Sequence, residues 1–406
     1  LMGHMESEKF LIAVSISATF LTMIFWSFGF LRMGTVGLIS QAFGKADYRE
    51  LVYIILRNII IAIFISLLII IFKPLLTHVL GEIFETTVQT KNLIDDYISI
   101  RVFSAPAELV IYVLIGFYLG LQRTFVSSLL IIILSLSNIL FSIYFVKVLN
   151  LNITGVALGT LIAAYFTVIS FSIYTYYFII KKFNIIPRFN SKSIFNYKRL
   201  FKLFNINFNI FVRTILLTFS FFWITYLSST LGEKYVAINS ILIQLVIISS
   251  FFLDAYAFST EGIIGYSVGK RSEKMFLSCV KNSIILSFIT GLVISFIFLL
   301  SVKEIIDLIT DIEFLRYLSY KYAFWVIVIP PIASFCYQLD GIFIGATQTA
   351  EMRNSMILSV VVYITLSLFL VNEIHNYGIW FALIIFMILR ASTLHFYFPK
   401  ILNKLR

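Results

Sequence analysis

Four acidic residues lie inside long apolar segments of this 406-residue chain, where an ionised carboxylate needs a partner, a water-filled cavity or a functional role. They are Glu108, Asp254, Glu261 and Asp340. Asp254 and Glu261 are seven residues apart, so on a helix they share a face and are separated by about 10.5 Å along its axis. Both carboxylates cannot hold one bare cation at that separation. We therefore expect each to have its own partner, and Asp340 on another helix is one candidate.

Burial and a neighbouring like charge both disfavour the ionised form of a carboxylate. Such a group takes up a proton near neutral pH, or exchanges it for Na⁺ or a cationic substrate. We therefore expect Asp340, Glu261 and Asp254 to couple cations or bind substrate. The alternative is a structural role, in which these acids pair with basic residues.

Four arginines are the basic counterparts within the apolar segments: Arg32, Arg101, Arg213 and Arg390. Arg101 and Glu108 are seven residues apart on one segment, and we expect all five residues to act as charge partners in the membrane. For the arginines, snorkelling to the interface is an equally good explanation.

The polar residues show no pattern of an enzyme or a cofactor site. The four histidines and two cysteines never reach metal-ligand spacing, and neither a P-loop nor a GxGxxG sequence occurs. No nucleophile and base stand in a recognisable arrangement. We expect a protein that is not an enzyme and has no metal or cofactor, apart from a coupling ion, H⁺ or Na⁺.

The elements that must position these charges are membrane-spanning helices. Hydrophobic residues make up 60% of the chain and charged residues 13%, and apolar runs of about 20 residues are long enough to cross a bilayer. The sequence predicts an all-α polytopic membrane protein. The eleven visible spans are 10–42, 51–76, 93–121, 125–148, 153–181, 203–230, 235–268, 276–301, 317–347, 352–372 and 377–399.

The formal net charge of +11 is spread unevenly over the loops. Lysine and arginine gather in alternate loops, including the cluster at 181–202 and the C-terminal Lys400 and Lys404, whereas acidic residues dominate the other loops. By the positive-inside rule the basic side, with the C-terminus, is cytoplasmic. The surplus charge therefore orients the protein and does not indicate nucleic-acid binding.

An internal repeat organises the chain. A shift of 225 residues pairs Thr35 with Thr260, and it pairs glycines, prolines and tyrosines of 97–124 with those of 322–349. A repeat of this length covers about six spans, which predicts two parallel six-helix repeats, as in some secondary transporters. We expect a truncated chain that lacks most of the first of twelve helices. The predicted domains are an N-terminal lobe at 1–180, a basic cytoplasmic linker at 181–202 and a C-terminal lobe at 203–406.

Pro106 and Pro331 are equivalent in this repeat, and both fall inside predicted spans. A proline within a helix removes a hydrogen bond and kinks the helix, so the pair suggests gating elements, although membrane helices also accept proline without a function. The segments 116–120 and 341–345 begin and end with glycine, a spacing that lets two helices approach closely.

The same residues carry a resemblance to the multidrug and toxic compound extrusion (MATE) family, in its DinF-like subgroup. The run Phe28-Gly-Phe-Leu-Arg-Met-Gly-Thr35 resembles the signature of the family's second helix. Further matching motifs follow in the family's order across nearly the whole chain. They are Ser104-Ala-Pro-Ala107, Arg213-Thr214, Ala237-x-Asn239, Gln244, Asp254, Glu261-Gly-x-x-Gly265, Asp340-Gly-Ile-Phe-Ile-Gly-Ala-Thr347 and Glu351-Met-Arg-Asn354.

The resemblance implies a twelve-helix exporter of the bacterial inner membrane that exchanges H⁺ or Na⁺ for organic, often cationic or amphipathic, compounds. It implies that Asp340, Glu261 and Asp254 match the acids of the second-lobe cavity. Asn138 and Thr160 match polar positions of a first-lobe cation site. Two departures put that first-lobe site in doubt: the acid of the first helix lies outside this chain, and Ser142 replaces the acid of the fifth helix.

We expect partners to be small hydrophobic or cationic substrates and membrane lipids, and the protein to be a monomer. One alternative function is a flippase for a lipid or lipid-linked glycan, which related bundles of the wider superfamily handle. The other is an inactive truncated transporter.

Overall fold

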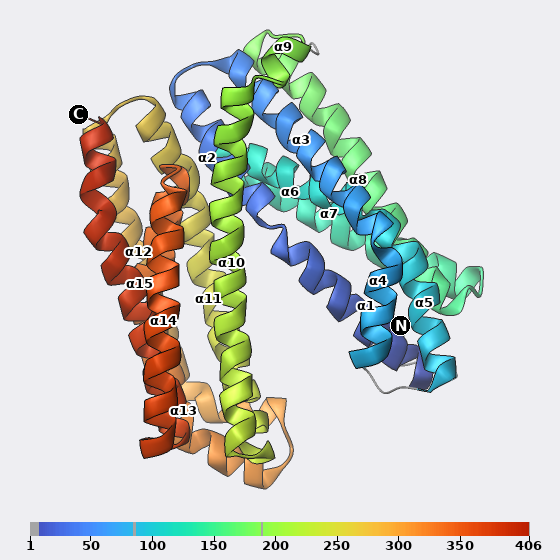
Figure 1. Ribbon diagram of the computed structural model, residues 1–406, viewed down its shortest axis with the longest axis vertical. Helices are drawn as coiled ribbons and strands as arrows, with labels where there is room; N and C mark the ends of the chain where they lie inside the picture. Colours follow the sequence, from blue (N-terminus) through green and yellow to red (C-terminus); the bar gives the residue numbers. More distant parts are fainter. Residues whose placement is uncertain (1–7, 84–86, 188–189, 406) are drawn as a thin grey trace. The chain divides into compact units, whose positions relative to one another are not determined.

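The structure is a computed structural model that describes residues 8–83, 87–187 and 190–405, and all regular elements within them are helices (Figure 1). Eleven helical segments of this described part are long and apolar enough to cross a membrane. They coincide with the eleven predicted spans and differ only at their ends, so the prediction of an all-α polytopic membrane protein is confirmed. Residues 1–7, where we expected the end of the first helix, lie outside the described part.

The helices fall into two compact units, which we describe separately. Unit 1 comprises the described residues up to Ala42 together with Ala46–Phe204. Unit 2 comprises Phe43–Lys45 and the described residues from Asn205 onward.

Unit 1 contains two membrane spans that are interrupted. The first breaks at Phe28 and Gly29, and another breaks at a 3-10 turn, Val102–Ser104. The α-helices of this part are α1 (Glu8–Ser27), α2 (Phe30–Gly44, whose last two residues belong to unit 2), α3 (Tyr48–Ile71), α4 (Lys73–Ile83), α5 (Val88–Arg101), α6 (Ala105–Gly120), α7 (Thr124–Ile143), α8 (Asn152–Phe183) and the short α9 (Ser191–Ile194). A five-residue π-helix, Tyr144–Val148, continues α7.

Unit 2 is built from long helices that pack side by side (Figure 1). Its core consists of buried aliphatic and aromatic side chains, and Tyr363 and Trp380 are among the largest of them. The helices are α10 (Tyr197–Leu231), which starts before the unit boundary, α11 (Glu233–Gly269), α12 (Glu273–Ile309), α13 (Glu313–Gly345), α14 (Thr349–Ile374) and α15 (Asn376–Leu405).

The helix boundaries reproduce the repeat found in the sequence. α5 begins at Val88 and α13 at Glu313, and α7 begins at Thr124 and α14 at Thr349, so both pairs differ by 225 residues. The turns obey the same shift: Gln122 (φ 60°) and Thr347 (φ 53°) both adopt the left-handed backbone conformation. The duplication therefore extends from residue identities to the backbone.

The paired glycines mark equivalent close contacts in the two units. A Cβ added at Gly116 on α6 would lie 2.6 Å from the carbonyl oxygen of Arg32 on α2. A Cβ added at Gly341 on α13 would lie 2.8 Å from the carbonyl oxygen of Ala257 on α11. Arg32 and Ala257 are themselves 225 residues apart. These glycines thus allow α6 to pack on α2 and α13 on α11 in the same register.

The segment after α8 is bonded to α3 by a buried arginine. Arg57 on α3 donates from Nε to the carbonyl oxygen of Ile194 at 3.0 Å and from Nη2 to that of Ser193 at 2.7 Å. It also pairs with Glu50 at 2.8 Å. These bonds satisfy carbonyl groups at the end of α9 that would otherwise have no partner in the helix.

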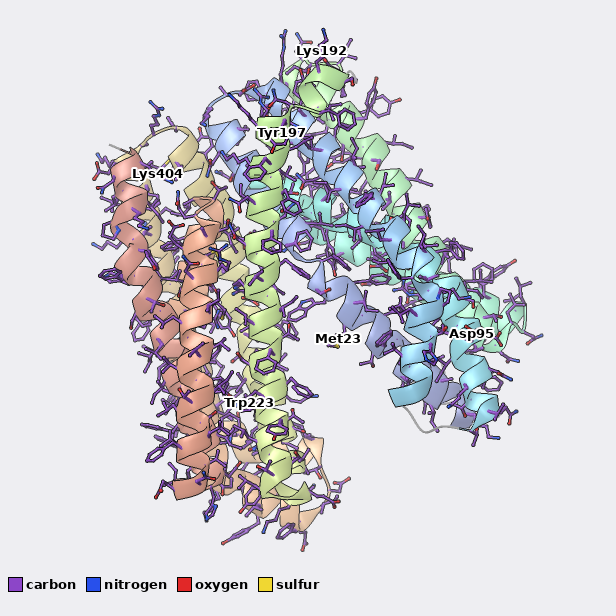
Figure 2. The ribbon with its side chains drawn as sticks, viewed as in Figure 1. Met23, Asp95, Lys192, Tyr197, Trp223 and Lys404 are labelled. Atoms are coloured by element: carbon purple, nitrogen blue, oxygen red, sulfur yellow. The ribbon has the colours of Figure 1, made fainter. Side chains whose placement is uncertain are left out.

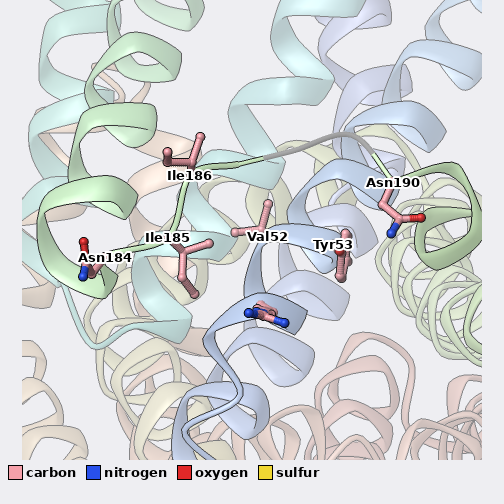
Figure 3. Close-up of a pocket in the computed structure, with 7 residues that line it drawn as sticks. Val52, Tyr53, Asn184, Ile185, Ile186 and Asn190 are labelled. Atoms are coloured by element: carbon pink, nitrogen blue, oxygen red, sulfur yellow. The ribbon is translucent and has the colours of Figure 1, made fainter.

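Next to this attachment lies a pocket of about 440 Å³ between α3 and the chain that leaves α8 (Figure 3). Val52 and Tyr53 line it from α3, and Asn184, Ile186 and Asn190 line it from the connecting chain.

Charge and exposure agree with a membrane location. Figure 2 shows Lys192 and Asp95 near opposite ends of unit 1, as expected for a basic side and an acidic side of the membrane. Large apolar side chains cover the outer faces of the helices, including Phe125 in unit 1 and Phe396 in unit 2, each more than three-quarters exposed. Such faces suit a hydrocarbon environment.

Enlarging either contact glycine should weaken the fold. We expect Gly116→Ala and Gly341→Ala each to destabilise the protein by about 1–3 kcal/mol, because the new methyl group meets a backbone carbonyl that cannot rotate away. The measurement is the thermal unfolding midpoint of the detergent-purified protein. Ser240→Ala, at an exposed position of α11, is the control and should not shift the midpoint. Unchanged midpoints in both glycine variants would contradict the close packing.

Candidate functional site

The candidate site of unit 2 is centred on Asp340, a buried carboxylate in the C-terminal half of α13. Arg390 on α15 donates from Nη2 to Oδ2 of Asp340 at 2.6 Å. Arg213 on α10 donates from its own Nη2 to the same oxygen. All three side chains are less than a tenth exposed, so three helices meet at one buried charge cluster.

This cluster carries one more positive than negative charge. Its two guanidinium groups share a single carboxylate, and the Nε atoms of Arg213 and Arg390 have no hydrogen-bond partner among the described residues. The guanidinium of Arg390 also lies over the ring of Phe386, 5.4 Å from its centroid. Buried charges that are incompletely satisfied are costly, which makes the cluster sensitive to any change in charge.

For Asp340 the sequence left two roles open, cation coupling and pairing with basic residues, and its contacts correspond to pairing. In this structure the carboxylate is bonded to two arginines on neighbouring helices. It does not stand alone as a bare acid. A proton or cation that binds Asp340 must therefore compete with both guanidinium groups.

The other two acids of unit 2 lie on α11. Glu261 is 1% exposed and Asp254 is half-buried, and neither is an isolated charge. The backbone of α11 at Glu261 is in direct contact with α13, because its carbonyl oxygen packs against Gly345. One residue earlier, the hydroxyl of Thr260 donates to Oε1 of Gln338 on α13 at 2.9 Å. The chain at Glu261 is thus tied to the helix segment that carries Asp340.

A pocket of about 720 Å³ lies between α11 and α12 and reaches this connection. Its walls include Tyr256 and Thr260 from α11 and Met275 and Ser278 from α12. Thr260 therefore has one side at the pocket and its hydroxyl on Gln338. A molecule in the pocket could contact Thr260, whose hydroxyl is bonded to Gln338 on α13, the helix that bears Asp340.

Two charged residues from the apolar segments of unit 1 pair at the break between α5 and α6. Arg101 and Glu108 form an ion pair at 2.9 Å across the 3-10 turn, and the guanidinium of Arg101 lies over the ring of Phe25 at 5.3 Å. The hydroxyl of Tyr165 donates to the carbonyl oxygen of Phe103 within the turn at 3.0 Å. Arg32 is buried on α2 and also takes part in contacts. These bonds satisfy polar groups that a broken helix exposes.

The two equivalent prolines have different surroundings. Pro331 lies inside α13, next to Pro330, as expected. Pro106 lies instead in the first turn of α6, where a missing N–H breaks no helical hydrogen bond. The interruption of that span is therefore a 3-10 turn between two helices, and Pro106 does not kink a continuous helix.

The polar residues expected in the first lobe are partly brought together. Asn138 on α7 donates from Nδ2 to the hydroxyl of Thr160 on α8 at 2.8 Å, and both side chains are half-buried. Ser142 is buried against Gly159, and its hydroxyl has no partner among the described residues. In the described chain, no three His, Cys, Asp or Glu side chains are arranged to hold a metal ion.

Two polar features of unit 2 had no role assigned to them from the sequence, although Asn239 belongs to a motif that resembles the family's. Gln338 is fully buried, and its Nε2 has no partner in the described residues, although it lies two positions before Asp340. A buried network also joins Asn239 to Asn376 at 2.7 Å and to Trp380 at 2.9 Å, linking α11 and α15. A search for ionisable groups in apolar segments passes over neutral amides. The motif Ala237-x-Asn239 pointed to Asn239 without a role, whereas only the weaker signal of amides within spans could have found Gln338.

Comparisons with known proteins agree with this architecture. The family model described as MatE matches residues 1–145 and 210–370. The chain is 31% identical to DNA damage-inducible protein F of Escherichia coli (strain K12) over 397 residues, which cover 97% of this chain and 85% of the relative. It is 25% identical to Protein DETOXIFICATION 43 of Arabidopsis thaliana over 297 residues, which cover 73% of this chain and 55% of that protein.

Solved structures share the fold at low sequence identity. An outward-facing multidrug resistance MATE family transporter of the MOP superfamily matches with a TM-score of 0.85 at 15% identity, over 98% of this chain and 89% of that one. A MATE structure in the straight conformation matches equally well, with a TM-score of 0.85 at 16% identity, over 98% of this chain and 89% of that one.

The buried cluster predicts an asymmetry between its members. Asp340→Asn should destabilise the protein by about 3–5 kcal/mol, because both guanidinium groups then lose their anion. Arg390→Gln should cost less, because Asp340 keeps Arg213 as a partner. Thermal unfolding of the purified variants measures both effects. Glu108→Gln makes the same change of carboxylate to amide in a more exposed ion pair with one arginine. It should cause the smallest loss of stability of the three variants. A larger loss for Arg390→Gln than for Asp340→Asn would contradict this account.

Proposed function

Because the chain belongs to the MatE family of membrane transporters, we propose that it is a cation-coupled antiporter that exports organic, often cationic or amphipathic, compounds. Members of this family are secondary transporters and not enzymes, so the expected family and the expected absence of enzymatic activity are both confirmed at that level. The coupling ion, H⁺ or Na⁺, and the substrate class are proposals. The observation that carries them is the group of charges inside unit 2.

That group supports the uptake of a single cation. Besides the Asp340 cluster of two arginines and one carboxylate, the apolar segments of unit 2 contain two further carboxylates, both on α11. At these two carboxylates one proton or one Na⁺ can be taken up without displacing an arginine from Asp340. The residues are Arg213, Arg390, Asp254, Glu261 and Asp340.

We assign the members of this group different roles. Asp340 is held by two arginines, so we propose that Glu261, with Asp254 on the same helix, first accepts the cation. The change then reaches Asp340 through the contact of α11 with α13 at Gly345 and Gln338. A shift in the balance between Asp340 and its arginines would alter the packing of the three helices that carry them.

The remaining predicted positions have supporting roles in this proposal. Pro331 lies in α13 nine residues before Asp340, so a change in its kink would move the carboxylate, whereas Pro106 would act at the α5 and α6 junction. Asn138 and Thr160 remain the polar site of the first lobe. Their hydrogen bond supplies one amide and one hydroxyl but no charge to hold a cation.

We also propose a location in the bacterial inner membrane, with the C-terminus in the cytoplasm and the protein acting as a monomer. The resemblance to an Escherichia coli protein supports a bacterial membrane. The basic residues at the end of α15, of which Lys404 is labelled in Figure 2, support the orientation.

Antiport can be tested in inside-out vesicles with a fluorescent lipophilic cation. We expect accumulation under an imposed pH gradient or an imposed Na⁺ gradient. It should fall roughly tenfold or more in Glu261→Gln and in Asp340→Asn, because each change removes part of the coupling between cation and substrate. Asp95→Asn, the same chemical change at an exposed carboxylate of α5, is the control and should transport normally.

Each outcome of this experiment is informative. The gradient that drives accumulation identifies the coupling ion. Normal transport by both Glu261→Gln and Asp340→Asn would reject the proposed site. No accumulation under either gradient by the folded wild-type protein would reject drug antiport and favour the flippase, for which a lipid-translocation assay is the direct measurement.

A further inference from the structure

A basic pocket lies at the C-terminal end of α8 in unit 1, away from the buried charges described above. Its volume is about 490 Å³, and it is bounded by α8 and by the turn between α6 and α7. The lining residues are Arg123, Tyr174, Tyr177, Phe178, Lys181 and Lys182. Three of the six are cations, three are aromatic, and none is acidic.

The three cations have no carboxylate partner among the described residues, so their charge is available to a ligand. Arg123 is nonetheless held in place, because its guanidinium lies over the ring of Phe178, 5.4 Å from the centroid. Lys181 and Lys182 in the last turn of α8 also favour that helix end electrostatically. Arg123 comes from a different element, so stabilisation of the end of α8 does not account for it.

The aromatic residues that line the pocket indicate its level in the membrane. Tyr174 and Tyr177 are exposed on α8 within two turns of its C-terminal lysines, and Ile173 beside them is exposed as well. Tyrosines with one apolar and one polar end gather where the membrane meets water, at the level of the lipid headgroups. The pocket therefore combines an apolar approach along α8 with positive charge at its end.

We infer that this pocket binds the phosphate of an anionic phospholipid headgroup. Arg123, Lys181 and Lys182 would contact the phosphate, and the rings of Tyr174 and Tyr177 would pack against the glycerol and upper acyl chain. Basic pockets between membrane helices on the cytoplasmic side are suited to anionic headgroups. A free phosphate is also an anion but has no apolar portion to use the aromatic wall. The inference rests on the membrane location of the chain and on the proposed orientation, and not on the antiport mechanism.

Native mass spectrometry of the detergent-purified protein, titrated with phosphatidylglycerol or with phosphatidylcholine, tests this site. We expect tighter binding of phosphatidylglycerol, and loss of that preference in the triple variant Arg123→Gln/Lys181→Gln/Lys182→Gln. The preference should fall at least about tenfold, because each basic side chain near an anionic surface contributes roughly fivefold.

The matched control is a triple variant of another basic stretch, Lys270→Gln/Arg271→Gln/Lys274→Gln, at the turn between α11 and α12 and in the first turn of α12, in unit 2. It removes the same charge and should keep the lipid preference. An equal loss in both triple variants would overturn the proposal in favour of general electrostatic attraction. Arg123→Gln alone provides a second test, and unchanged binding in that variant would also overturn it.

A titration with inorganic phosphate in uncharged detergent distinguishes the two sources of the anion. Phosphate binding that is lost in the pocket variant, with no preference for phosphatidylglycerol, would replace the lipid by a soluble phosphate compound. The readout is binding and not transport, so failure of this site and failure of the antiport proposal are separate results.

Discussion

The cost of placing an unsatisfied polar group in hydrocarbon is the constraint on which the rest of this structure depends. It requires the backbone to bond within helices, and it requires a specific remedy wherever a helix is broken. At the α5 and α6 break, Tyr165 supplies a donor to the carbonyl of Phe103, and Arg101 and Glu108 pair across the turn. At the end of α9, the buried Arg57 serves the last carbonyls. At these two places the end of regular structure is thus accompanied by a polar side chain from a neighbouring element.

The duplication separates what is shared by the two halves from what is not. Backbone contacts are shared, since the carbonyls that meet Gly116 and Gly341 are equivalent positions. The charges are not shared. The position equivalent to Asp340 is Ile115, and the position equivalent to Glu261 is Val36. One helical framework therefore supports two chemically different interiors, and the side chains that give unit 2 its buried anions have no counterpart in unit 1.

Much of this architecture could be predicted from the sequence, because hydropathy and repeat spacing depend on many residues at once. All eleven spans, the 225-residue shift and the close glycine contacts belong to this class. The pairing of Asp340 with two arginines could only be named as an alternative, since it depends on which faces of α10, α13 and α15 meet. The helix break before Pro106 was mistaken for a kink, because proline is compatible with either structure. Gln338 was missed because a neutral amide changes hydropathy very little.

The shared carboxylate of Asp340 also affects how this site can change during evolution. Either arginine can be lost while the acid retains one guanidinium partner, so a lineage can pass through a single replacement without leaving an orphan anion in the membrane. The opposite order, in which the acid is lost first, has no comparably stable intermediate. Sequence drift in this transporter should therefore be directional, with Arg213 or Arg390 varying before Asp340 does. A carboxylate that is bonded to two arginines thus allows the charges inside unit 2 to change by one replacement at a time.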